Sequence, residues 1–148
     1  HLRPDLMAMR SKPTRKIFLT RKDAENRNIS NQEQLVLALK GWEQVTLDNL
    51  TLTEQVKIFK EASHILSPHG AGLVNTLWCQ PGTKVIELQH KKFIDKKVYP
   101  ILSYHLGLHH KVYLAKAKKI NKAKPKNKKS KDMVDLEINI PELIKLLD

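Results

Sequence analysis

Cysteine is nearly absent from this 148-residue sequence, because Cys79 is its one thiol. This excludes an intrachain disulfide and any site built from several cysteines. Long apolar runs are also missing, and no stretch approaches the roughly 20 residues that a membrane-spanning helix needs. No signal-peptide pattern opens the chain, which begins at His1, so we expect a piece of a longer or processed protein. The length predicts one domain, and the 41% hydrophobic and 28% charged residues are ordinary for a globular one.

Acidic residues are absent between Lys116 and Lys131, where nine lysines lie. The formal charge of the whole chain is +12. Without those nine lysines the chain has 18 basic and 15 acidic side chains, so the charge of the remainder is nearly balanced. A run of like charges with little to bury is typical of a flexible loop. The alternative is a patch that binds the phosphates of nucleic acid or of an anionic surface, although no aromatic residue is interleaved for stacking. We therefore divide the chain into a domain at 1–115, a lysine-rich loop at 116–131 and a strand and helix at 132–148 that pack back on the domain.

Short β-prone segments alternate along the chain with segments of helical character. Capping boxes begin two of the helical segments, at Ser30 and Thr51. The alternation predicts an α/β fold with a Rossmann-like parallel sheet and helices on both faces. Ligands of such sheets bind at the edge where the strands end. The expected strands are 16–20, 42–47, 64–67, 84–88 and 110–114, and the expected helices are 30–41, 51–63, 73–78, 95–106 (broken or kinked at Pro100) and 142–147.

The most informative turn is His69-Gly70-Ala71-Gly72, which follows the third expected strand and precedes a helix. Small residues let a ligand approach the backbone, and the first N–H groups of a helix favour an anion. His69 adds a side-chain donor. The alternative is a tight turn whose glycines only allow helix and strand to pack, and G-x-G alone does not decide between the two.

Charged residues at the same edge point to a phosphate-bearing ligand. Arg21 and Arg27 follow the first strand, and a guanidinium binds phosphate through a planar fork. Glu87 ends the fourth strand, where a carboxylate can bind the hydroxyls of a ribose. The alternative for Glu87 is an ion pair with Lys91 or Arg21.

Metal and nucleophile chemistry has little support in the sequence. His105, His109 and His110 have a spacing that can suit a metal, but no carboxylate or cysteine lies near them, so we favour a non-metal role. No set of Ser, His and Asp or of Cys and His can be argued from spacing. We therefore expect no metal and no cofactor.

Taken together, several motifs between about residues 15 and 114 resemble glycosyltransferase family 61. That family includes N-acetylglucosaminyltransferases of proteins and O-mannosyl glycans, plant xylan transferases and bacterial capsule-biosynthesis homologues. The residues that carry the resemblance are Arg21, Arg27, Ile29, Asn31, Gln34-Leu35, Gly41-Trp42-Glu43-x-Val45, Thr53-Glu54-Gln55-Val56-x-x-Phe59-x-x-Ala62, Pro68-His69-Gly70-Ala71-Gly72-Leu73-x-Asn75 and Pro81-Gly82-x-x-Val85-Ile86-Glu87-Leu88.

The resemblance implies one half of a GT-B fold, the half that holds a nucleotide-sugar donor, commonly a UDP-sugar. It implies inverting, metal-independent transfer to a glycan or protein acceptor, with arginines and helix dipoles in place of a divalent ion. Arg21 and Arg27 would contact the diphosphate, the turn His69–Gly72 would hold its phosphates, Asn75 would line the site, and Glu87 would face the ribose.

A GT-B enzyme has two domains, so the resemblance also implies a missing N-terminal half that supplies acceptor contacts and often the catalytic base. No residue here is assigned as the base, because a phosphate contact is the more economical role for His69. We expect this chain to be inactive alone. The expected location is the cytoplasm, at the membrane surface, for a bacterial protein and the secretory-pathway lumen for a eukaryotic one. A scaffold domain that has lost its chemistry is a further alternative.

Overall fold

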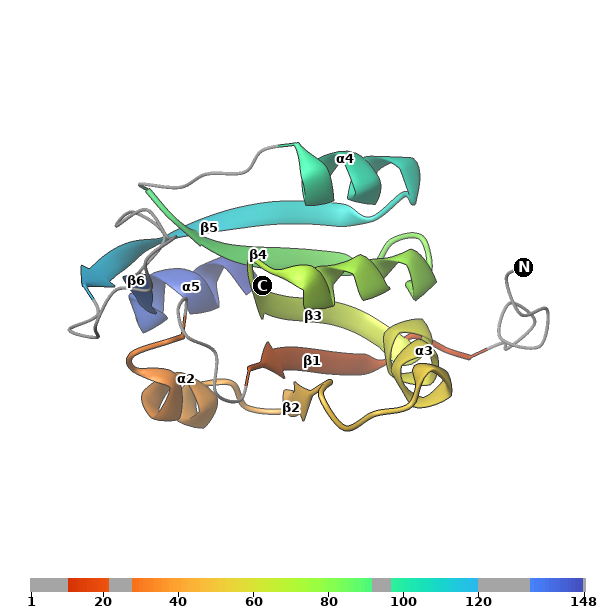
Figure 1. Ribbon diagram of the computed structural model, residues 1–148, viewed down its shortest axis with the longest axis horizontal. Helices are drawn as coiled ribbons and strands as arrows, with labels where there is room; N and C mark the ends of the chain where they lie inside the picture. The colour runs from red at the N-terminus through yellow and green to blue at the C-terminus, as the bar shows by residue number, and fades with distance from the viewer. Residues whose placement is uncertain (1–10, 22–27, 92–96, 120–133, 148) are drawn as a thin grey trace, which may run out of the picture.

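A six-stranded sheet forms the centre of the computed structural model, which describes residues 11–21, 28–91, 97–119 and 134–147 (Figure 1). The strand order is β2-β1-β3-β4-β5-β6. The first five strands are parallel to their neighbours, and β6 is antiparallel to β5. The strands are β1 (Arg15–Thr20), β2 (Glu43–Thr46), β3 (Ala62–Pro68), β4 (Lys84–His90), β5 (His109–Lys119) and β6 (Val134–Glu137).

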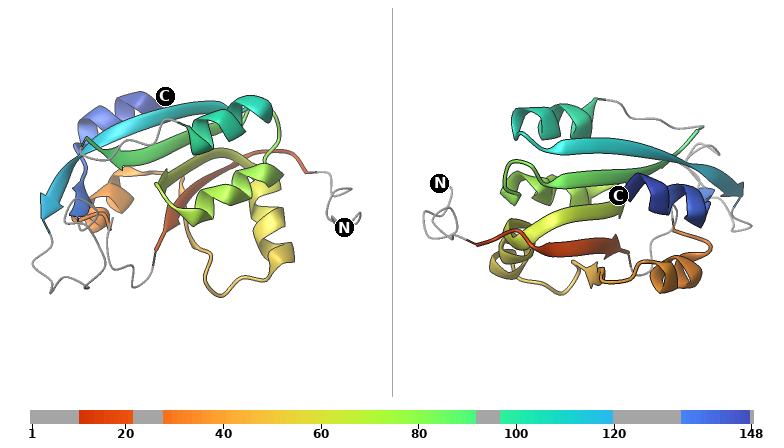
Figure 2. Two further views of the ribbon diagram at one scale, coloured as in Figure 1. Left: turned by 45° about the horizontal axis from the view of Figure 1, so that its top comes forward. Right: turned by 180° about the vertical axis from the view of Figure 1, so that it is seen from behind.

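Helices cover both faces of this sheet. Seen from behind, α2 and α5 lie over one face, while α3, η1 and α4 lie over the other (Figure 2). Successive strand residues point to opposite faces, so Phe18 packs with the α2 and α5 core and its neighbour Ile17 packs with the other. The helices are α2 (Gln32–Ala38), α3 (Leu52–Glu61), the 3-10 helix η1 (Ala71–Trp78), α4 (Val98–His105) and α5 (Ile140–Leu147).

These elements confirm the predicted mixed α/β architecture with helices on both faces. Three helices differ from expectation. Helix α2 begins at Gln32 with Asn31 as its N-cap and no side-chain cap hydrogen bond, so the capping box expected at Ser30 is absent. The helix expected at 73–78 begins earlier, at Ala71, and is a 3-10 helix. Pro100 neither breaks nor kinks α4, because it lies in the first turn, where a missing N–H costs no helical hydrogen bond. Among the described residues, no helix is long and apolar enough to cross a membrane.

The lysine-rich segment was wrongly expected to be a loop throughout. Strand β5 continues to Lys119, so Lys116 and Lys118 lie in regular structure. They stand opposite Glu137 and Asp135 of β6, and opposite charges in directly facing positions stabilise a strand pair. The rest of that segment, 120–133, lies outside the described residues.

Strand β6 also contacts the segment before α2, on the side away from β5. Ile29 forms a parallel bridge with Leu136. The Leu136 N–H donates to Asn28 O at 2.7 Å, and the Ser30 N–H donates to Leu136 O at 2.8 Å. One short strand therefore joins the far edge of the sheet to the start of α2.

The order of the strands reverses direction between β1 and β3. Strand β2 lies beside β1 on one side of this point, and β4 and β5 lie beyond β3 on the other, so the point is a topological switch point. In doubly wound sheets of order 2-1-3-4-5, ligands bind in the crevice beyond the strand ends at such a point. The residues that follow β1 and β3 are Arg21 and His69.

Candidate functional site

A pocket of about 480 Å³ opens beyond the ends of β1 and β3, at the switch point. Arg21 contributes one wall of this switch-point pocket, and the backbone of 70–72 contributes another. The amide side chains of Gln55 from α3 and Asn75 from η1 complete the polar lining. Two segments predicted to meet at one edge of the sheet, Arg21 and the glycine turn, therefore border a single cavity.

The glycine turn forms one wall of the pocket through its backbone. The Leu73 N–H donates to Gly70 O at 3.1 Å, which is the first hydrogen bond of η1. Since a 3-10 helix bonds each N–H to the carbonyl three residues earlier, the N–H groups of Ala71 and Gly72 precede the helical ladder. Backbone N–H groups at such a start favour an anion.

Packing alone does not require the two glycines of this turn. A Cβ on Gly70 would lie 3.9 Å from Arg21 Nη1, and one on Gly72 would lie 3.4 Å from Leu47 Cδ1, which are ordinary contacts. The backbone of Gly70 is extended, with φ 167°, so it is open to other residues as well. A side chain at Gly70 would instead occupy space beside the Arg21 guanidinium. Because glycine leaves this space open, we favour the interpretation that the turn binds a ligand.

The arginines and amides predicted for the site have different outcomes. Arg21 lines the pocket, but Arg27 lies outside the described residues. Asn75 lines the pocket as expected, and its side-chain amide donates to Gln55 Oε1 at 3.2 Å. Gln55 in turn donates to Leu50 O at 3.0 Å, so both amides are held in place.

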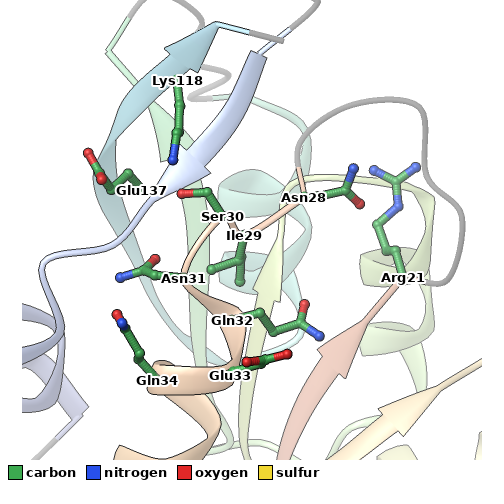
Figure 3. Close-up of a pocket in the computed structure, with 10 residues that line it drawn as sticks. All are labelled: Arg21, Asn28, Ile29, Ser30, Asn31, Gln32, Glu33, Gln34, Lys118 and Glu137. Carbon is green, nitrogen blue, oxygen red and sulfur yellow. The ribbon is translucent and has the colours of Figure 1, made fainter. Parts of the chain in front are cut away.

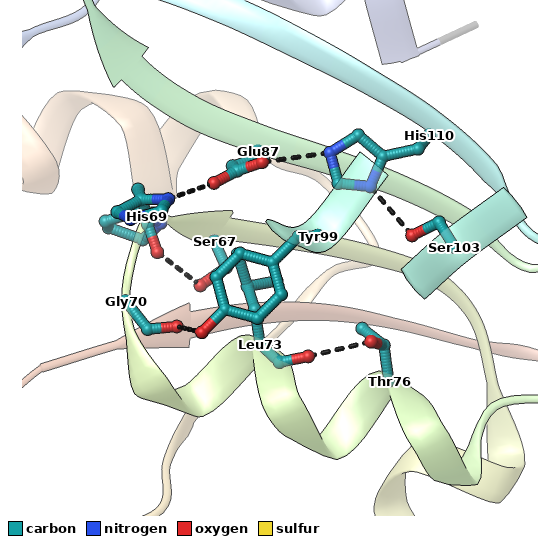
Figure 4. Close-up of polar contacts among 10 residues, drawn as sticks. Ser67, His69, Gly70, Leu73, Thr76, Glu87, Tyr99, Ser103 and His110 are labelled. Atoms are coloured by element: carbon teal, nitrogen blue, oxygen red, sulfur yellow. Dashed lines mark hydrogen bonds and ion pairs between the residues drawn. The ribbon is translucent and has the colours of Figure 1, made fainter. Parts of the chain in front are cut away.

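Glu87 is not at the surface of the pocket, contrary to the prediction that it faces a ribose. Its side chain is fully buried. It accepts hydrogen bonds from His69 Nδ1 and, at 2.9 Å, from His110 Nε2 (Figure 4). Glu87 therefore pairs with these two histidines, whereas the alternative interpretation predicted an ion pair with Lys91 or Arg21. Ribose hydroxyls therefore have no access to this carboxylate.

Two opposing effects determine the ionisation of Glu87. Burial by itself raises the pKa of a carboxyl group, and the hydrogen bonds and charges of His110 and His69 lower it. The histidines prevail, so the pKa of Glu87 lies below its ordinary value. The site therefore contains a buried carboxylate that two imidazoles stabilise in its ionised form.

The histidines considered as metal ligands are separated in the structure. His110 bonds to Glu87 and, through Nδ1, to Ser103 Oγ at 2.8 Å, whereas His109 is exposed at the start of β5. In the described parts of the chain, no three His, Cys, Asp or Glu side chains converge as metal ligands do.

Sequence reasoning missed His110, Ser103 and Tyr99 as neighbours of the site. The Tyr99 ring packs edge-on against His69, with centroids 5.5 Å apart, and its hydroxyl donates to Gly70 O at 2.7 Å. A usable signal was the position of Glu87 itself, since an acid inside an apolar central strand needs partners. The sequence offered no means of identifying which residues of α4 and β5 supply them.

A second, polar pocket of about 700 Å³ lies beside the first and shares Arg21 with it (Figure 3). Its other walls come from 28–34 and from the β5–β6 pair, through Lys118 and Glu137. Asn31 is committed to structure, because its side chain donates to Ile138 O at 2.8 Å and accepts from Ile138 N at 3.1 Å. Arg21 therefore lines both cavities.

Comparison with known proteins relates this chain to glycosyltransferases. A human protein, "Protein O-linked-mannose beta-1,4-N-acetylglucosaminyltransferase 2", is 39% identical over 69 residues, which are 43% of this chain. The match covers 12% of that relative, so the chain corresponds to a small part of its length. The model of the family described as Glycosyltransferase 61 matches residues 1–86, a stretch that includes β1, β3 and the glycine turn. The chain belongs to glycosyltransferase family 61.

Proposed function

We propose that this chain forms the donor-binding half of a GT-B glycosyltransferase, with the nucleotide-sugar diphosphate in the switch-point pocket. The observation that carries the proposal is the meeting of Arg21 with residues 70–72, at the start of η1, around one cavity. A Rossmann-like half is supported by the strand order and by helices on both faces. Membership of a glycosyltransferase family supports sugar transfer as the reaction.

The proposed chemistry is inverting and independent of metal ions, as the resemblance implied. In this proposal Arg21 and the N–H groups of Ala71 and Gly72 stabilise the negative charge that develops on the departing diphosphate. Donors that are already oriented before the reaction are effective in this role because they need little rearrangement. Arg21 suits it because its side chain reaches Gly70, so the guanidinium and the backbone face the same space.

The acceptor and the second domain are also proposals. The human relative is named for transfer of N-acetylglucosamine to O-linked mannose on protein, so we propose a glycan or glycoprotein acceptor and use UDP-N-acetylglucosamine as the donor probe. Its animal origin favours the secretory-pathway lumen over the bacterial location. The catalytic base and most acceptor contacts would come from the N-terminal half of a GT-B enzyme, without which we expect no transfer.

A titration of the 148-residue chain with UDP and UDP-N-acetylglucosamine by isothermal calorimetry tests the proposal. We expect saturable binding of both ligands, because the diphosphate that they share is the group the pocket would hold. ATP serves as a comparison for base preference. Absence of any binding at millimolar ligand, in a sample whose circular dichroism shows a folded protein, would refute a donor site in this chain.

A further inference from the structure

The hydrogen bonds around Glu87 use both of its carboxylate oxygens. Oε1 faces His69 Nδ1, and Oε2 faces His110 Nε2 at 2.9 Å. The three residues come from different parts of the sheet: the turn after β3, the middle of β4 and the start of β5. Glu87 has no exposed surface, so solvent does not compete for either oxygen.

The position of each proton follows from these contacts. An ionised carboxylate only accepts hydrogen bonds, and the lowered pKa of Glu87 keeps it ionised near neutral pH. The two ring nitrogens that face it, His69 Nδ1 and His110 Nε2, must therefore both carry hydrogen. Neutral His110 then has a bare Nδ1, which accepts from the Ser103 hydroxyl at 2.8 Å.

We propose that Glu87 is a positioning residue that holds His69 in the tautomer with hydrogen on Nδ1 and so orients the turn whose residues 70–72 line the switch-point pocket. His110 and Ser103 support Glu87 from behind. Tyr99 adds a second restraint, because it packs against the His69 ring and also bonds to the carbonyl of Gly70. The ring and the glycine turn are thereby fixed relative to each other. The role of the turn in ligand binding rests on the proposed function, whereas the tautomer does not.

The tautomer is tested without any ligand by long-range ¹H–¹⁵N NMR of the histidine rings. The spectrum is recorded at about pH 8.5, well above the ordinary imidazole pKa of about 6.5. His69→Gln and His110→Gln assign the two rings. We expect hydrogen on Nδ1 of His69 and on Nε2 of His110, and hydrogen on Nε2 of His69 would overturn the proposal. The wild-type spectrum decides this even if substitutions at Glu87 do not fold.

Substitution of Glu87 then tests its positioning role. In a folded Glu87→Gln variant the amide offers one acceptor and one donor, so we expect one of the two rings to change tautomer. Glu33→Gln is the matched control, because Glu33 is exposed on α2, which packs on the other face of the sheet. The proposal fails if Glu87→Gln leaves both ring spectra as they are in the control.

Discussion

Glu87, fully buried in the middle of β4, accepts a hydrogen bond from His69, which begins the turn whose next three residues line the switch-point pocket. The contact joins the interior of the sheet to the turn before η1. A carboxylate that looks like a ligand contact in the sequence thus contacts a histidine instead. The effect of substituting Glu87 on binding must therefore be separated from its effect on stability.

Arg21→Ala should weaken binding of UDP-N-acetylglucosamine by about 1.5–3 kcal/mol, the range for a hydrogen bond to a charged group. The reason is that Arg21 lines the switch-point pocket beside Gly70. Calorimetry measures the change. Lys40→Ala removes an exposed positive charge after α2 and should leave the affinity unaltered. Equal affinities of wild-type and Arg21→Ala would show that Arg21 does not face the ligand.

Gly70→Ala should reduce binding strongly while the free energy of unfolding changes little. The extended backbone accepts alanine, and the new Cβ would have only an ordinary contact with Arg21. It would, however, enter the space where the phosphates are proposed to bind. Urea denaturation and calorimetry, measured on the same sample, separate the two effects.

Gly41→Ala is a control for Gly70→Ala, because we expect it to lower stability and leave binding unchanged. Gly41 has φ 76°, in the left-handed region, so alanine there should cost about 1 kcal/mol of stability although nothing lies within 4 Å of its Cβ. Its distance from the pocket lining predicts unchanged affinity for UDP-N-acetylglucosamine. A loss of binding in Gly41→Ala equal to that in Gly70→Ala would refute the ligand interpretation of the turn.

Glu87→Gln should lower the free energy of unfolding at pH 7 by about 1–3 kcal/mol, because both ring contacts lose their charged partner and one ring must change tautomer to accept from the amide. The folded-state pKa of Glu87 is depressed, so its contribution to stability is complete above the ordinary value of 4.5 and disappears as pH falls through the folded value. The difference between wild-type and variant should therefore shrink on acidification. Urea titrations at pH 7 and pH 3 measure it, and a constant difference would contradict an ionised Glu87.

Metal removal should leave donor binding intact. If Arg21 and backbone N–H groups neutralise the diphosphate, EDTA or added Mg²⁺ should change the affinity for UDP-N-acetylglucosamine less than twofold, which is about 0.4 kcal/mol by the usual conversion. The same titration in each condition provides the comparison. A loss of binding in EDTA that Mg²⁺ restores would exclude a metal-independent site.

The switch-point pocket could be anticipated from sequence because parallel strands place their ends at one edge, and so Arg21 and Gly70 were predicted to converge. The partners of Glu87 could not be predicted from the sequence, because they depend on which residues of α4 and β5 face inward after packing. The alternation of strands and helices likewise predicted the sheet. The strand character of Lys116 and Lys118 could not be seen locally, because it depends on pairing with acidic residues of β6, about 20 positions away.

The position of β6 has a consequence for the order of folding. Its bonds to Asn28 and Ser30 close a loop of more than 100 residues, whereas β1 to β5 are added through shorter connections. Long-range closures carry the larger entropic cost and slow folding. We therefore expect the five parallel strands to assemble first and β6 with α5 to dock late, so that a nascent chain exposes Ile29 and Leu35 until residues 134–147 have been synthesised.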